Sequence, residues 1–130
     1  MICLSHLLKR IPICSALLLG IATLASADPI PQGLDGYKSR VAPFFESNCI
    51  KCHGPEKSKG KITVHSLDGD LSAGQELERW ELILEMLESG EMPPEEEPQP
   101  GEEDRNAVAA WIEAGMRDYV TEASQESAAP

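Results

Sequence analysis

The amino-acid sequence predicts an all-α domain of three main helices joined by long loops. Apolar side chains recur at helical spacing in three segments of the 130-residue chain, and stretches rich in proline and glycine separate these segments. The alternation typical of a strand is weak and limited to residues 62–67 (ITVHSL), where we expect a short strand or an extended loop. No segment repeats another, so a single domain is expected.

Residues 1–27 have the three parts of a secretory signal peptide. Lys9 and Arg10 form a short positive region, an apolar and uncharged run follows, and the sequence ASA at 25–27 offers the small residues that signal peptidase recognises. The apolar run is shorter than the about 20 residues that a membrane-spanning helix needs. We therefore expect cleavage after Ala27 and a mature protein that is periplasmic or secreted, without stable membrane insertion.

The chain is acidic and poor in aromatic residues. It carries 11 basic and 22 acidic side chains, and this acidic excess excludes nucleic-acid binding through a basic surface. Two Trp, two Tyr and two Phe are few for a core of this size. We therefore expect a bound group to supply apolar bulk, and we expect the protein without that group to fold poorly.

The first two expected elements lie between residues 28 and 48. Residues 28–36 are rich in proline, glycine and aspartate and are expected to form an irregular lead-in. The first helix is expected over residues 37–48. Pro43 should either begin this helix or kink it, because proline lacks a donor N–H.

Two further helices are expected downstream. Residues 73–89 show the clearest helical pattern, and Gly90 follows at the expected stop. A proline-rich acidic loop comes next, and the acidic residues at 102–104 begin the last helix, where the helix dipole favours negative charge. The expected domain covers residues 37–120, and residues 121–130 are expected to be a disordered tail.

Cys49-Ile50-Lys51-Cys52-His53 is a C-x-x-C-H motif, which is the attachment signature of c-type haem. Two thiols three positions apart can each bond one haem vinyl group as a thioether, and the adjacent histidine can then bind the iron. We therefore predict one covalent haem c, attached at Cys49 and Cys52, with His53 as an axial iron ligand.

Three other kinds of site stay open for these residues. A thioredoxin-type redox pair normally opens a helix next to a strand, and no such unit is predicted here. A zinc site would need His65 as well, at a spacing unlike the usual short histidine pair, and Cys52 and His53 are adjacent and point in different directions. A disulfide between Cys49 and Cys52 would close too short a loop to add much stability.

A second axial ligand is expected downstream, from His65, Met86, Met92 or Met116. We favour Met92, because it follows a helix stop and precedes two prolines whose stiff backbone can hold a thioether in place. Met86 and Met116 lie in helices, where packing is the commoner role of methionine. His65 is the second choice, because it lies too close in sequence to His53 to reach the opposite face of the haem easily. His/Met ligation raises the reduction potential relative to bis-His ligation.

Three stretches of the sequence, FFESNCIKCHGPEKSKGKITV, ERWELILEMLESGEMPPEEEPQP and AVAAWIEAGM, resemble the class I c-type cytochrome domain of planctomycete-type secreted proteins. The resemblance covers about residues 38–118. It implies the small mono-haem cytochrome c fold, with the first and last helices packed together beside the haem. It also implies thioether bonds at Cys49 and Cys52 and the axial ligands His53 and Met92.

Together, these observations predict a periplasmic mono-haem c-type cytochrome that carries single electrons between redox partner proteins and has no catalytic residues of its own. Two alternatives stay open: a haem protein with an open or labile sixth site, acting as a gas sensor or a peroxidase-like enzyme, and an accessory haem subunit of a larger oxidoreductase. Lysines at 51, 57, 59 and 61 either orient an acidic redox partner or form a solvated loop.

Overall fold

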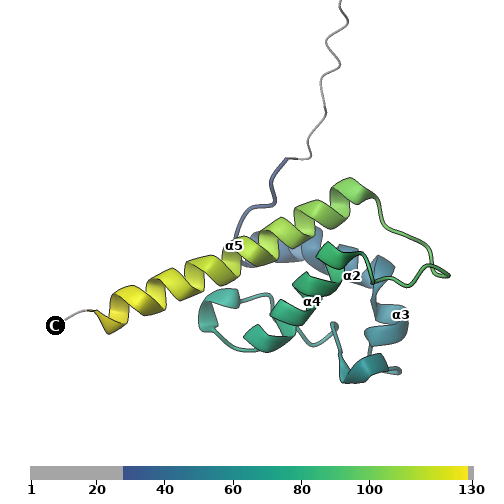
Figure 1. Ribbon diagram of the computed structural model, residues 1–130, viewed down its shortest axis with the longest axis horizontal. Helices are drawn as coiled ribbons and strands as arrows, with labels where there is room; N and C mark the ends of the chain where they lie inside the picture. Colours follow the sequence, from purple (N-terminus) through teal and green to yellow (C-terminus); the bar gives the residue numbers. More distant parts are fainter. Residues whose placement is uncertain (1–27, 129–130) are drawn as a thin grey trace, which may run out of the picture.

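The computed structural model describes residues 28–128, and within that range every regular element is a helix (Figure 1). The prediction of a signal peptide at residues 1–27 lies outside the described residues. The all-α prediction is confirmed, and residues 62–67 form a loop. The elements in chain order are α1 (Leu34–Gly36), η1 (Tyr37–Val41), α2 (Ala42–Asn48), α3 (Ile50–His53), η2 (Lys59–Lys61), η3 (Leu71–Ala73), α4 (Leu77–Ser89) and α5 (Glu102–Ser127).

The first helical segment changes its type just before Pro43. Element η1 is a π-helical turn in which the N–H of Ala42 bonds to the carbonyl of Tyr37, five residues earlier. In a regular α-helix the Pro43 ring would clash with the carbonyl of Ser39. The wider π turn includes Ser39 and therefore lies at the place of this expected clash. Pro43 therefore sits in the first turn of α2, and α2 ends at Asn48 as predicted.

Helix α4 begins at Leu77, later than the predicted start at residue 73. Gly74 and Glu76 both adopt left-handed backbone conformations, with φ of 67° and 60°, so the chain turns before the helix starts. A Cβ at Gly74 would overlap the ring of Tyr119, so a side chain at this turn would displace that ring. The predicted end is confirmed: α4 stops at Ser89, and Gly90 caps it with a φ of 72°.

Helix α5 begins at Glu102, as the acidic residues predict, and continues to Ser127. The prediction of a disordered tail is therefore wrong for residues 121–127. The hydroxyls of Thr121, Ser124 and Ser127 each donate to the backbone carbonyl four residues earlier, which lets these polar residues continue the helix. In Figure 1 this end of α5 extends beyond the other helices.

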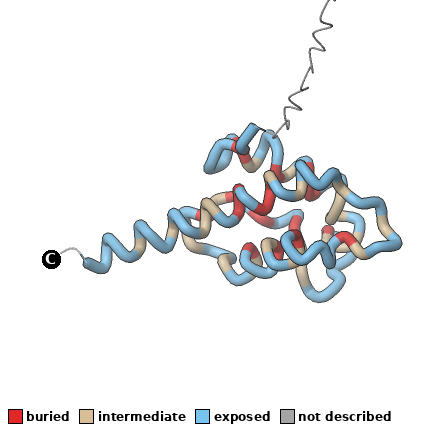
Figure 2. The backbone as a smooth tube through the Cα atoms, turned by 45° about the horizontal axis from the view of Figure 1, so that its top comes forward, coloured by how far each residue is buried: buried red, intermediate tan, exposed pale blue. Residues whose placement is uncertain are grey.

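An aromatic cluster of Tyr37, Phe45, Trp80 and Trp111 lies where η1, α2, α4 and α5 meet. Ring centroids in this cluster are between 5.9 and 6.2 Å apart. Trp80 is fully buried, and Phe45 and Trp111 are each 2% exposed. Figure 2 shows that the buried backbone is concentrated at this junction of the helices. Four of the six aromatic residues of the chain are thus gathered in one place.

The lead-in is fixed to α5. The Nε1–H of Trp111 donates to the carbonyl of Pro31 at 2.9 Å, and the Gln32 amide donates to the Trp111 carbonyl at 3.3 Å. Ile30 is buried in the core. Residues 34–36 are already helical, so the irregular part of the lead-in is shorter than predicted.

Replacing Trp80 with alanine is expected to destabilise the fold by about 3–5 kcal/mol, the usual cost of removing a buried aromatic side chain. Chemical denaturation of the intact protein, followed by circular dichroism, measures this loss. Glu81→Ala is the matched control, because Glu81 is an exposed neighbour on the same helix; its effect should be below about 0.5 kcal/mol. Equal denaturation midpoints for the two variants would contradict the role of Trp80 in the core.

Candidate functional site

The C-x-x-C-H motif lies on α3, a single helical turn that follows the end of α2. The backbone N–H groups of Cys52 and His53 both bond to the carbonyl of Cys49, at 3.1 and 2.9 Å. Cys49 itself departs from the helical conformation, with a φ of −121°, and this departure separates α2 from α3. The two cysteines are not joined by a disulfide. Their spacing of three positions on one turn brings the thiols to neighbouring places on one face.

The loop after α3 holds the imidazole of His53. Nδ1 of His53 lies 3.1 Å from the carbonyl oxygen of Ile62. A carbonyl only accepts hydrogen bonds, so Nδ1 is the donor in this contact and Nε2 is the ring nitrogen left to bind a metal. The N–H of Val64 also donates to the backbone carbonyl of His53 at 2.8 Å, which fixes the loop against the motif.

A cavity of about 390 Å³, which we call the α3 cavity, opens beside the motif. Its volume lies within the range of about 300–1,000 Å³ that is typical of cofactor sites. No Phe, Tyr or Trp occurs among the described residues that line it, because the aromatic side chains are gathered elsewhere. The lining consists of Ser47, Asn48, Cys49, Lys51, Cys52, His53, Lys59, Gly60, Ile62, Val64, Leu82, Ile83, Met86, Leu87, Met92, Pro93, Pro94, Glu97 and Pro98.

This cavity fits a covalently bound haem. The donor set of two thiols and an imidazole lies on one side of the lining, from α2 to α3, while α4 supplies the aliphatic side chains of Leu82, Ile83 and Leu87. Apolar walls that exclude water, with few polar groups, are what an apolar macrocycle needs. The sequence-based expectation that a bound group supplies apolar bulk agrees with this space.

The structure separates the four candidates for the second axial ligand. Met86 and Met92 line the α3 cavity together with His53. His65 is exposed and outside the lining, and Met116 packs against the hydrophobic core. Met92 is 36% exposed, so no core packing competes for its thioether. Two methionines are thus placed for the role, and the choice of Met92 stays a prediction.

The environment of Cys49 is unlike that of a redox-active thiol pair. Burial raises the pKa of the Cys49 thiol to about 11, whereas reactive cysteines have a pKa below the ordinary value near 8.5. Among residues 28–128, no group of three or more His, Cys, Asp and Glu side chains is placed to hold a metal ion, so the zinc site with His65 is not assembled there. The geometry favours haem attachment over both alternatives.

One contact at the cavity was not predicted from the sequence. Nζ of Lys51, on α3, lies 2.6 Å from Oε2 of Glu97, in the loop after α4. This hydrogen bond raises the pKa of Lys51 and lowers the pKa of Glu97, and the positive charges of Lys59 and Lys57 lower the Glu97 pKa further. Nothing in the sequence distinguishes Glu97 from the two glutamates before it, so only the structure identifies this contact.

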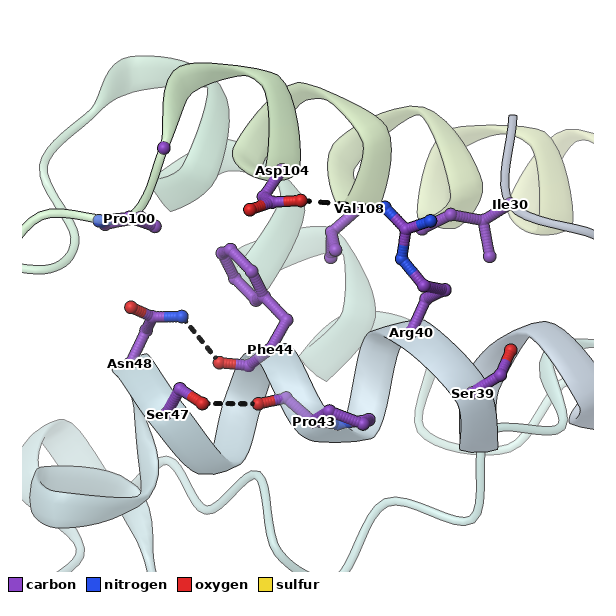
Figure 3. Close-up of a pocket in the computed structure, with 11 residues that line it drawn as sticks. Ile30, Ser39, Arg40, Pro43, Phe44, Ser47, Asn48, Pro100, Asp104 and Val108 are labelled. Atoms are coloured by element: carbon purple, nitrogen blue, oxygen red, sulfur yellow. Dashed lines mark hydrogen bonds and ion pairs between the residues drawn. The ribbon is translucent and has the colours of Figure 1, made fainter. Parts of the chain in front are cut away.

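A second cavity, of about 370 Å³, lies between the first helical segment and α5 (Figure 3). Phe44 reaches from α2 toward α5 at its centre, and Arg40 pairs with Asp104 at 3.6 Å. The side chains of Ser47 and Asn48 donate to carbonyls of their own helix. These polar groups therefore already have partners, and none of the predicted ligands of the haem iron lines this cavity.

An all-α domain whose C-x-x-C-H turn lines an apolar cavity has the small cytochrome c fold. Residues 49–96 match the family model described as planctomycete cytochrome C, and this part of the chain is a planctomycete-type cytochrome c domain. The matched segment runs from the first cysteine of the motif past Met92. The chain matches none of the curated proteins and none of the solved structures with which it was compared.

The match of residues 49–96 to this family model indicates a haem c protein, and a domain of this kind suggests electron transfer rather than catalysis. Domains of this kind are typically extracytoplasmic. Within the part of the chain that the structure describes, no helix is long and apolar enough to cross a membrane.

Proposed function

We propose that the protein is a periplasmic mono-haem c-type cytochrome that carries single electrons between redox partner proteins. One observation carries this proposal: both cysteines of the motif, its histidine and Met92 line a single apolar cavity. These residues lie in two segments that are distant in sequence. A chance motif on a surface turn would have no such cavity beside it.

Each of these residues has a distinct role. Cys49 and Cys52 tether the haem through thioether bonds, and His53 binds its iron through Nε2, oriented by the Ile62 carbonyl. Met92, which lines the same cavity, would supply a thioether as the second ligand. The haem, when bound, supplies an iron that alternates between two oxidation states.

The walls of the cavity support the same function. Ile83 and Leu87 are buried and exclude water from one side of the cavity, whereas Leu82 on the same helix is exposed. A dry, apolar surrounding disfavours extra positive charge and therefore raises the reduction potential. With His53 and Met92 both as ligands, the iron would have no position left for a substrate, which favours a carrier over an enzyme.

The surface near the motif offers a place for a partner. Lys57, Lys59 and Lys61 are exposed and follow α3 directly. In an acidic chain, such a local positive surface would orient an acidic redox protein toward the cavity during encounter. Export by a signal peptide at residues 1–27, cleaved after Ala27, completes the proposal and places the carrier in the periplasm.

The visible absorption spectrum tests the function. The exported protein is expected to show sharp low-spin c-type bands when reduced, and carbon monoxide should leave these bands unchanged. Bands that shift with carbon monoxide would instead indicate an open or labile sixth site, as in a gas sensor or a peroxidase-like enzyme. A colourless protein would contradict haem binding and return the two cysteines to thiol or zinc chemistry.

A further inference from the structure

The bond between Lys51 and Glu97 joins the two segments that carry the predicted axial ligands. Lys51 lies inside the motif on α3, two residues before His53. Glu97 lies in the loop of residues 91–101, which also carries Met92 and which we call the Met92 loop. The two charged atoms are 2.6 Å apart, and both side chains line the α3 cavity.

The Met92 loop has other anchors, but these lead to α4, to α5 or to the loop itself: the N–H of Met92 donates to the carbonyl of Met86 at 3.4 Å. The amide of Gln99 donates to the carbonyls of Pro93 and Pro94 at 3.0 and 2.9 Å, which organises the loop internally. Nη2 of Arg105 donates to Oε1 of Gln99 at 2.8 Å and ties the loop to α5. Among the side-chain hydrogen bonds of the described residues, the Lys51–Glu97 bond is the one that ties this loop to α3.

We propose that Lys51 and Glu97 form a clamp that holds the Met92 loop against α3 and thereby keeps the Met92 thioether at its axial position. The inference rests on the proposed function, because it concerns a methionine bound to iron. Lys57 and Lys59 add to the positive surface that Glu97 faces. The pair is a positioning device, since neither side chain serves as a ligand.

The clamp lowers the fraction of molecules in which the Met92 loop is open. The Lys51 side chain is 71% exposed, so solvent screens the pair and its effect is moderate. Exposed pairs of this kind shift an equilibrium by about two- to fivefold. An external ligand that binds the iron only when Met92 leaves has an apparent affinity proportional to the open fraction. Loss of the clamp should raise that affinity by the same factor.

The experiment measures the affinity of the oxidised holoprotein for imidazole, a neutral ligand whose binding changes the visible spectrum. The variants Lys51→Gln and Glu97→Gln are compared with the parent, and each is expected to bind imidazole about two- to fivefold more tightly. The double variant should match the single variants, because one shared contact is lost in all three. Lys38→Gln and Glu96→Gln remove the same kinds of charge at exposed positions without touching this bond, and they should match the parent.

Salt gives a second readout. At about 1 M salt the Debye length falls to about 3 Å, so the parent should approach the affinity of Lys51→Gln while that variant changes little. The clamp would be overturned if the single variants bound imidazole with the affinity of the parent. It would also be overturned if the effect of the double variant were the product of the two single effects. Failure of the proposed function would show separately, in a parent protein that lacks low-spin c-type bands before any substitution is made.

Discussion

The exported protein is expected to lose covalent haem when Cys49 and Cys52 are both replaced by serine. Serine keeps the size of the side chain but cannot form the thioether bonds. Haem detection after denaturing electrophoresis should give less than about 1% of the parent signal, because only covalent haem survives that treatment. Ser47→Ala is the control: Ser47 lines the same cavity and its hydroxyl, among residues 28–128, bonds only to the carbonyl of Pro43, so this variant should keep its haem.

The same double substitution should also destabilise the fold. Without the macrocycle, the aliphatic wall of Ile83 and Leu87 faces water or collapses into the cavity of about 390 Å³. The free energy of unfolding should fall by about 3–5 kcal/mol or more, because removal of one large buried aromatic group alone costs that much. Denaturation followed by circular dichroism measures it. A haem-free variant as stable as the parent would show that the aromatic cluster alone sustains the domain.

The features that the sequence predicted well are those set by nearby residues. The end of α4 depends on Gly90, the start of α5 on three consecutive acidic residues, and the recognition of a cytochrome c domain begins with five consecutive residues of one motif. In each case the physical cause lies within one or two helical turns. The residues on which these features depend therefore lie in short stretches of the sequence.

The features that the sequence did not reveal depend on contacts between distant segments. Lys51 and Glu97 are 46 residues apart, and several other glutamates in the same loop have the same chemistry. Gly74, in the turn before α4, lies against the ring of Tyr119 on α5, which is another contact between distant segments. The aromatic side chains cluster away from the motif and leave the α3 cavity without them. This arrangement is a property of the packed helices. No local pattern encodes any of these.

Replacing Met92 with alanine is expected to convert the iron to a high-spin state, to let carbon monoxide bind and to lower the reduction potential. The loss of a thioether ligand removes the preference for the reduced iron, and axial ligands change haem potentials over about 0.8 V, so we expect a decrease on the order of 0.1 V or more. Visible spectroscopy and a redox titration measure both changes. Met86→Ala is the matched control, because Met86 lines the same cavity from α4.

The pair of variants assigns the ligand in either direction. If Met92 is the ligand, Met86→Ala stays low-spin, because it removes only packing and leaves the thioether of the Met92 loop in place. If Met92→Ala stays low-spin with an unchanged potential while Met86→Ala becomes high-spin, the ligand is on α4 instead. In that case the clamp of Lys51 and Glu97 would hold a loop without a ligand, and its loss would leave imidazole binding unchanged. The ligand assignment and the role of the clamp therefore test each other.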